Sequence, residues 1–324
     1  MEDFVYLFPP LLEALLAIII ALFVFNRKEL WRPFSKIKKK SWLLLFLVLL
    51  AGFSARMLVV PHAHQIYYDG FAHINLAQNI SNSNVFCVCQ KGTDTACESC
   101  NARWWPAGYQ TILGIVFSVF GGSEGTAFNT NAVIGSLSIV LVFLLAFMVF
   151  KSEKAALWAS LLFAFIPAHL NLSGSVGMEI TSLFFVLLSL VLLEICIRSK
   201  KFSVFVLFLA VFSYAVQTRP ENFVLVFFIP VFVWLRAGKQ VKRFYSIKHL
   251  AAIAVFLLSL AVLVQVLDFR ITDAPGTKWN VKTAPQLSYV LEHLAPNILF
   301  FLWPKYNSIV FIALAFVGGA FLLK

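Results

Sequence analysis

Long apolar runs separated by short polar segments set the pattern of this sequence. Most of the runs approach the roughly 20 residues that an α-helix needs to cross a bilayer. The pattern therefore predicts an all-α polytopic membrane protein with about nine transmembrane helices and additional interfacial helices. The predicted spans are 5–25, 41–60, 128–150, 155–172, 179–197, 202–218, 222–235, 250–267 and 307–323.

One further apolar run, at 107–122, is too short to be counted with them. Between Gly108 and the pair Gly121–Gly122 it offers about 13 helical residues, or roughly 20 Å, which is well short of a roughly 30 Å hydrocarbon core. Basic residues decide its placement, because segment 26–40 has seven Lys and Arg and three later loops have ten more. All 17 share one side only if this run does not span, as the positive-inside rule favours. We therefore expect an interfacial helix on the outer face.

The composition agrees with a membrane protein and narrows its partners. The chain is 60% hydrophobic and only 13% charged, whereas soluble domains carry about 25% charged residues. A net charge of +11 would suggest nucleic acid in a soluble protein, but here the basic residues form short clusters between apolar runs, where they act as topology signals. No nucleic-acid partner is expected. Glu2 and Asp3 precede the first run, so it is predicted to be a true span rather than a cleaved signal peptide.

The nine spans place the N-terminus outside and the C-terminus inside, in a single membrane domain over 1–324. Two long external loops result: 61–127, which holds interfacial helices and a cysteine cluster, and 268–306. Seven Lys and Arg on the outer side run against the positive-inside rule, so we expect these cations to bind something. They are Lys91, Arg103, Arg219, Arg270, Lys278, Lys282 and Lys305.

Two carboxylates on the outer side are candidates for chemistry. Asp69 lies in "YYDGFAHINLAQNI", a stretch typical of a short amphipathic helix, which Asp69 either caps or supplies with a reactive group. Glu179 follows the small-residue stretch "NLSGSVGM" and opens the next helix, where the helix dipole alone would favour a carboxylate. Two carboxylates on separate loops can bind one divalent cation or share general-base work. The sequence leaves metal dependence open.

Two arginines on the outer side are candidates for anion binding. Arg219 lies in "QTRPEN" between two short spans, where an arginine needs a partner. That partner is either Glu221 or an anion such as a phosphate, which a guanidinium binds with two hydrogen bonds. Arg103 and Trp105 lie in "RWWPAGY". Tryptophans are ordinary interfacial anchors, and indole rings beside a cation also suit a sugar or a lipid headgroup.

Four cysteines and three histidines gather in the same external loop. Cys87, Cys89, Cys97 and Cys100 have a spacing that fits either two disulfides or a four-thiolate zinc site. In both cases the predicted role is structural, because the loop is too short for a core of its own. The three histidines are His62, His64 and His73. Their spacing favours interfacial polar residues over metal ligands.

Three stretches in this order carry a family resemblance: "YYDGFAHINLAQNI", "WWPAGYQTILGIVFSVFGG" and the segment from "NTNAVIGS" to "GSVGMEITSLFF". Over roughly residues 41–235 the chain resembles GT-C superfamily membrane glycosyltransferases. These include protein O-mannosyltransferases, lipid A aminoarabinose transferases and oligosaccharyltransferase catalytic subunits. The chain departs from the family at Gly70, where many relatives have a second acidic residue, and near Pro106, where many have a double proline or a lysine.

The resemblance implies transfer of a hexosyl or pentosyl group from a polyprenyl-phosphate donor, such as a dolichyl phosphate, to a protein or glycolipid acceptor, with inversion at the anomeric carbon. It implies an extracytoplasmic active site in a multi-pass cell-membrane protein. Asp69 would be the general base, and Glu179 would hold the acceptor or a metal. The expected phosphate ligands are Arg219, Arg103 and Lys278, and the expected acceptor or sugar contacts are Tyr68, His73 and Trp105.

Two other classes of function stay open on the sequence alone. A transporter or flippase of a lipid-linked or anionic substrate would place charged residues near mid-membrane and often has internal repeats. Apart from Glu13 the spans look bare, and no repeat is visible. A non-catalytic membrane subunit would use the cysteine-rich loop for docking. Sugar transfer by the purified chain would separate the enzyme from both.

Overall fold

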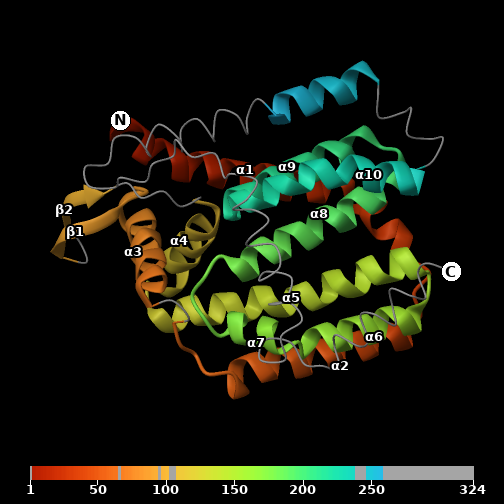
Figure 1. Ribbon diagram of the computed structural model, residues 1–324, viewed down its shortest axis with the longest axis horizontal. Helices are drawn as coiled ribbons and strands as arrows, with labels where there is room; N and C mark the ends of the chain where they lie inside the picture. Colours follow the sequence, from red (N-terminus) through yellow and green to blue (C-terminus); the bar gives the residue numbers. More distant parts are fainter. Residues whose placement is uncertain (1, 65–66, 94–95, 102–106, 238–245, 258–324) are drawn as a thin grey trace, which may run out of the picture.

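The structure is a computed structural model that describes residues 2–64, 67–93, 96–101, 107–237 and 246–257. Long helices lie side by side along the length of the molecule, and helices α3 and α4 gather with a β-hairpin at one end (Figure 1). The helical polytopic class predicted from the apolar runs is confirmed.

Four helices are long and apolar enough to cross a membrane among the described residues. They are α1 (Glu2–Trp31), α2 (Lys39–Ser54) with the π-helical turn Ala55–Val59 that continues it, α5 (Glu124–Phe150) and α8 (Glu179–Ser199). A fifth span results if α6 (Glu153–Ala164) and α7 (Pro167–Ser173), which meet at a 58° bend, cross as one.

Shorter apolar helices account for other predicted spans. They are α9 (Phe202–Thr218), α10 (Leu225–Ala237) with the 3-10 turn Pro220–Val224 before it, and a helix over 247–257. The count of nine spans stays a prediction, because 307–323 and the second half of 250–267 lie outside the described residues.

Local sequence explains the tight turns that join the long helices. Ser123 and Ser152 cap the N-termini of α5 and α6, where their hydroxyls accept hydrogen bonds from the backbone of Thr126 and Ala155 at 3.1 and 3.3 Å. Helices α5 and α8 end at Lys151 and Lys200, which take left-handed backbone conformations with φ of 52° and 59°. Such a residue reverses the chain within a few positions. The next helix can therefore pack antiparallel against the one before it.

Polar contacts sort the helix ends into two groups. At one end, the Lys38 amide donates to Glu153 at 3.4 Å, and Lys201 pairs with Glu29 at 3.8 Å. Arg198 also donates there, to the Met148 carbonyl. We call this the basic end, because the Lys- and Arg-rich connections 26–40, 151–154 and 198–201 lie there.

The opposite end of the bundle, which we call the site end, holds Asp69, Glu124, Glu179 and Arg219. Contacts there join the loop after α2 to the turn after α7, with the Ala63 amide donating to the Gly174 carbonyl at 3.2 Å. The separation of the two ends agrees with the charge-based topology. The side of the membrane that each end faces stays a prediction.

Helix α4 (Gly108–Phe120) begins and ends at the site end. Its first carbonyl, from Gly108, accepts a hydrogen bond from the Tyr214 hydroxyl near the end of α9 at 2.8 Å. The Gly122 carbonyl just beyond its last turn accepts from Gln78 of α3 (Tyr67–Ser83) at 2.9 Å. Its 13 residues therefore do not run the length of the bundle. The interfacial position in the membrane stays a prediction.

The cysteine-rich stretch forms an antiparallel β-hairpin that the sequence analysis did not predict. Strands β1 (Val88–Thr93) and β2 (Ala96–Asn101) pair with Cys89 opposite Cys100. Cys87, just before β1, is disulfide-bonded and buried. A disulfide-bonded Cys87 is not available as a thiolate ligand, which favours disulfides over a four-thiolate zinc site. The side chains of the other three cysteines lie outside the described part, so their pairing stays a prediction.

Candidate active site

Asp69 lies in the first turn of α3 at the site end and is half-buried. The residue after it, Gly70, is buried, and a Cβ added there would lie 2.1 Å from Nδ1 of His64. The His64 ring stacks on Phe71 at 4.6 Å between centroids and lies 5.4 Å from Phe128, so its position is well defined. This packing leaves no room for a carboxylate at position 70. It gives a physical reason for the departure from the acidic pair of the family.

His73 connects α3 to α4 one helical turn after Asp69. The Gln110 side chain hydrogen-bonds Nδ1 of His73 at 2.7 Å, and the Tyr109 ring packs edge-on at 5.3 Å. His73 is only 2% exposed, and burial lowers its pKa to about 3. A neutral, buried imidazole suits a support for the Asp69 helix. Direct contact between His73 and a sugar stays a prediction.

Asn131 of α5 holds the turn that leads into Glu179. It is fully buried, and its amide nitrogen donates to the carbonyls of Ser175 and Gly177 at 2.7 and 3.0 Å. Two hydrogen bonds from one amide fix the path of a turn that would otherwise leave buried carbonyls unpaired. Glu179 begins α8 two residues later, so the position of its carboxylate depends on this contact.

Tyr109 brings α4 up to the same turn. It is fully buried, and burial raises the pKa of its hydroxyl, with a further contribution from the nearby Glu179 carboxylate. The hydroxyl lies near Asn131 and Gly177, although it makes no hydrogen bond of normal geometry with them. The Asp69 helix is thus connected through α4 to the Glu179 turn.

Buried oxygen atoms without a hydrogen-bonding partner among the described residues surround Glu179. They belong to Tyr109, Asn131 and Thr181, and all three side chains are fully buried. Buried polar atoms are normally paired. Because all three side chains are closed to solvent, these oxygen atoms favour ordered water beside the Glu179 turn and not a direct contact with a ligand.

Glu179 and Arg219 form an ion pair at the surface of the site end. Arg219 Nη1 lies 3.8 Å from Glu179 Oε1, and Arg219 Nε lies 3.4 Å from Glu221 Oε2. The Glu179 and Arg219 side chains are 33% and 37% exposed, so solvent weakens their attraction and both groups can exchange partners. The sequence offered Glu221 or an anion as partner of Arg219, and the structure adds Glu179.

The structure describes only some of the cations and aromatic residues that were predicted to contact the phosphate and the sugar. Arg103, Trp105 and Lys278 lie outside the described residues, and of Tyr68 the backbone alone is described, in the first turn of α3. Among the described side chains, no hydrogen bond or ion pair joins Asp69 to Glu179. Within the same part of the chain, no group of three or more His, Cys, Asp and Glu is arranged to hold a metal.

Arg56, which the sequence analysis overlooked, is fully buried at the end of the second span. Its guanidinium donates to Nδ1 of His169 at 2.7 Å and to the Ala164 carbonyl at 3.2 Å, with longer contact to Ser173. Ala164 is the last residue of α6 before the bend, where the normal helical donor is lost, so Arg56 satisfies the freed carbonyl.

The expectation of bare spans is wrong on this point and on a second. Glu194 of α8 is also buried, and it pairs with Arg236 at 2.6 Å and Arg198 at 3.3 Å near the basic end. The signal was available, since an ionised residue within an apolar run is costly and needs a partner. Both groups have partners within the bundle, so each is accounted for by packing between helices.

These features define a polytopic helical membrane protein with a carboxylate–arginine site at one end of its bundle. The family model described as dolichyl-phosphate-mannose-protein mannosyltransferase matches residues 106–265, close to half of the 324 residues. This match supports the assignment of the chain to the GT-C superfamily of membrane glycosyltransferases, as the resemblance implied. Comparison with curated proteins and with solved structures found no match.

The matched region includes Glu179, Arg219, Tyr109 and Asn131, which are the residues that build the surface ion pair and its support. Asp69 precedes the matched region, and only the resemblance and its place at the site end connect it with the chemistry.

Proposed function

We propose that this protein transfers a sugar from a polyprenyl-phosphate-linked donor to an acceptor hydroxyl on the extracytoplasmic face of the membrane. The observation that carries the proposal is the partly exposed Glu179–Arg219 pair within the matched region, at the same end of the bundle as Asp69. Lipid-linked donors fit this placement, because nucleotide sugars are cytoplasmic and these groups lie opposite the basic end.

In the proposed reaction, the bond between the anomeric carbon and the donor phosphate oxygen breaks as the acceptor oxygen attacks from the opposite face. The acceptor proton passes to Asp69, and the configuration at the anomeric carbon inverts. Arg219 exchanges one of its carboxylate partners for the phosphate, whose charge grows as it leaves. Glu179, freed from that partner, accepts a hydrogen bond from the acceptor.

The donor proposed for the first assay is the mannose form, because the matching family is described by dolichyl-phosphate mannose and a protein acceptor. The Glu179–Arg219 pair suits a phosphate and a hydroxyl group, but it does not choose among sugars. Pentosyl and other hexosyl donors are therefore compared in the same assay. The expected products are polyprenyl phosphate and a mannosylated protein in equal amounts.

The proposal is tested by transfer in membranes that contain the full chain, with Asp69→Asn as the main variant. Loss of a general base lowers transfer rates by about 10²–10⁴-fold. In Arg219→Met the guanidinium that would donate hydrogen bonds to the leaving phosphate is lost, which should lower the rate by about 10²–10³-fold. Glu124→Gln is the carboxylate control at the same end; Glu124 is half-exposed and lies 3.8 Å from His64 Nε2, so the stability of this variant is measured with its activity. Asp69→Asn with activity near that of the wild type would remove Asp69 from the chemistry, and no transfer by the purified wild-type chain would favour a non-catalytic subunit.

A further inference from the structure

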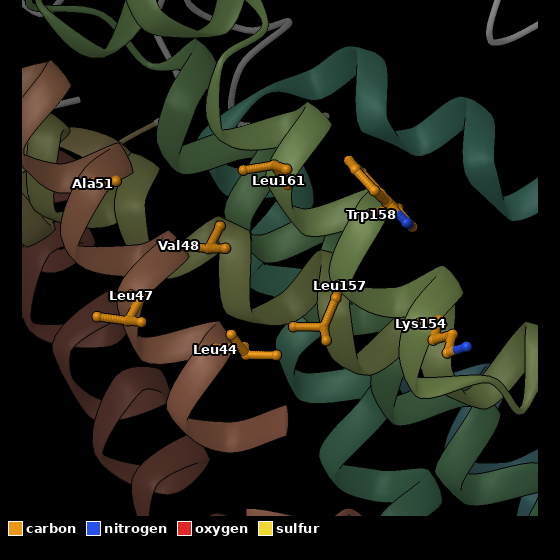
Figure 2. Close-up of a pocket in the computed structure, with 8 residues that line it drawn as sticks. All are labelled: Leu44, Leu47, Val48, Ala51, Lys154, Leu157, Trp158 and Leu161. Atoms are coloured by element: carbon orange, nitrogen blue, oxygen red, sulfur yellow. The ribbon is translucent and has the colours of Figure 1, made fainter. Parts of the chain in front are cut away.

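A hollow in the membrane-facing surface lies between α2 and α6, near the basic end and far from the Glu179–Arg219 pair. Its volume is about 440 Å³, which is within the usual range of small-molecule sites. Figure 2 shows the eight lining residues, with Leu44 of α2 and Leu157 of α6 toward each other between the two helices. We call it the α2–α6 groove, and its lining residues are Leu44, Leu47, Val48, Ala51, Lys154, Leu157, Trp158 and Leu161.

The lining follows the same spacing on both helices. Each contributes residues at positions i, i+3, i+4 and i+7, from Leu44 to Ala51 on α2 and from Lys154 to Leu161 on α6. This spacing places them on one face of each helix. Seven positions of helix correspond to about 10 Å, so the groove runs about 10 Å into the apolar part of the bundle from the end that carries the lysines.

The two helices start together, which fixes the mouth of the groove. Glu153, the first residue of α6, accepts hydrogen bonds from the Lys38 amide and from the Ser41 hydroxyl at the start of α2. Lys154 follows at once and is exposed, and it is the one charged residue of the lining. Exposed lysines at 38, 39 and 40 extend this cationic rim.

An apolar groove in a bilayer is not selective by itself, because lipid tails are as apolar as the leucines that line it. Leu47 and Trp158 are 50% and 63% exposed, and the described residues do not cover them. Selectivity must come from the shape of the groove and from the lysines at its mouth. Each lysine near the headgroups of anionic lipids contributes about 1 kcal/mol of attraction.

We propose that the α2–α6 groove binds one acyl chain of an anionic phospholipid, whose phosphate is held by Lys154 and the neighbouring lysines of the rim. The occupant is a membrane phospholipid and not the polyprenyl donor, because the groove opens at the basic end, whereas the donor phosphate belongs at the site end. Only the exclusion of the polyprenyl donor rests on the proposed function, and the test measures lipid binding alone.

The test uses Trp158 as a reporter in the purified full chain. The protein is placed in phosphatidylcholine vesicles that contain phosphatidylglycerol with brominated acyl chains, which quench a tryptophan they touch. The chain has eight tryptophans, so the Trp158→Phe variant is measured in parallel and its signal is subtracted. Brominated phosphatidylcholine serves as the neutral lipid.

We expect half-maximal quenching of Trp158 at a mole fraction of brominated phosphatidylglycerol at least about fivefold lower than that of brominated phosphatidylcholine, since the 1 kcal/mol from one lysine corresponds to about fivefold. Lys154→Gln should reduce this preference by about fivefold. Ala51→Phe fills the groove and should abolish the selective quenching. This second variant keeps the proposal testable if Lys154→Gln does not fold. Lys28→Gln, an exposed lysine at the same end, is the matched control and should keep it.

Equal quenching by the two lipids would overturn the proposal, and so would equal losses in Lys154→Gln and Lys28→Gln. Relief of quenching by polyprenyl phosphate at lower concentration than by unbrominated phosphatidylglycerol would assign the groove to the donor lipid and also reject it. Sugar transfer is measured separately with the Asp69 and Glu124 variants, so each proposal can fail without the other.

Discussion

Replacing Asn131 with alanine should detach the turn before Glu179 from the bundle. The variant removes the amide that donates to the Ser175 and Gly177 carbonyls at 2.7 and 3.0 Å. The hydrogen bond to Ser175 is buried, so water cannot replace it without opening the structure, whereas the bond to Gly177 is only partly buried. The consequence should be a lower free energy of unfolding together with a displaced Glu179 carboxylate.

The magnitude follows from the two carbonyls. A buried polar group that loses its partner costs about 1–3 kcal/mol, so two carbonyls cost about 2–6 kcal/mol. The variant also removes the Asn131 side-chain oxygen, which has no partner among the described residues, and this returns about 1–3 kcal/mol. At the same cost per group, the net loss in free energy of unfolding should be about 1–3 kcal/mol.

The assay is denaturant unfolding of the purified full chain in detergent micelles, followed by transfer kinetics. Asn129→Ala is the matched control, since Asn129 lies two residues away on α5 and is exposed. We expect Asn129→Ala to stay within about 0.5 kcal/mol of the wild type. In the transfer assay, Asn131→Ala should lower kcat/KM. The loss should be larger for transfer to the acceptor than for hydrolysis of the donor by water, because Glu179 is proposed to hold the acceptor.

Equal free energies of unfolding and equal transfer rates for Asn131→Ala and Asn129→Ala would show that Asn131 does not hold the turn before Glu179. If Asn131→Ala loses stability but transfers to the acceptor and to water with equal losses, Asn131 does hold the turn, but the proposed role of Glu179 in binding the acceptor is rejected.

Three further predictions concern the supports of the site. Gly70→Ala should destabilise the chain by about 1–3 kcal/mol through a clash with the neighbouring histidine ring, whereas Gly125→Ala, whose Cβ would meet only one atom at 3.8 Å, should be tolerated; thermal unfolding of both tests this. Arg56→Met should leave the Ala164 carbonyl without a donor, so faster amide exchange at the bend between α6 and α7 is expected, and unchanged exchange there would contradict it. Because the pKa of His73 is lowered in the folded chain, the unfolded state binds the extra proton first, and stability should fall as pH drops from about 6.5 toward about 3, by at most about 1.4 kcal/mol per pH unit; a His73→Gln variant with the same acid dependence would argue against this.

The helical membrane class could be predicted from the sequence, because apolar runs of bilayer length admit few other structures. Asp69 and Glu179 could also be assigned to the same end of the bundle, opposite the Lys- and Arg-rich connections, although the side of the membrane that this end faces stays a prediction. What the rule does not supply is distance. The approach of Arg219 to Glu179 depends on how α8 and α9 pack, and no local signal in "QTRPEN" names a partner forty residues earlier.

Other features were missed for identifiable reasons. Arg56 was hidden within an apolar run, although its charge alone called for a partner. The β-hairpin was missed because "VCQKGT" and "ACESCN" hold only two β-branched residues, Val88 and Thr93, and no aromatic residue, so they lack the usual signal of strands. The departure at Gly70 could be seen in the sequence, but its cause could not, because it depends on a histidine ring that folds back from six residues earlier.

The central claim is that Asp69 and Glu179 belong to one aqueous site on the extracytoplasmic face. Single cysteines introduced at 69 and 179 test it directly, with a membrane-impermeant maleimide applied to intact cells and the unsubstituted chain as background. A third cysteine at Lys154 reports the basic end. The account predicts that 69 and 179 react from outside and that 154 reacts only after the cells are opened. Reaction of 69 and 179 from opposite sides, or of 154 from outside, would contradict it.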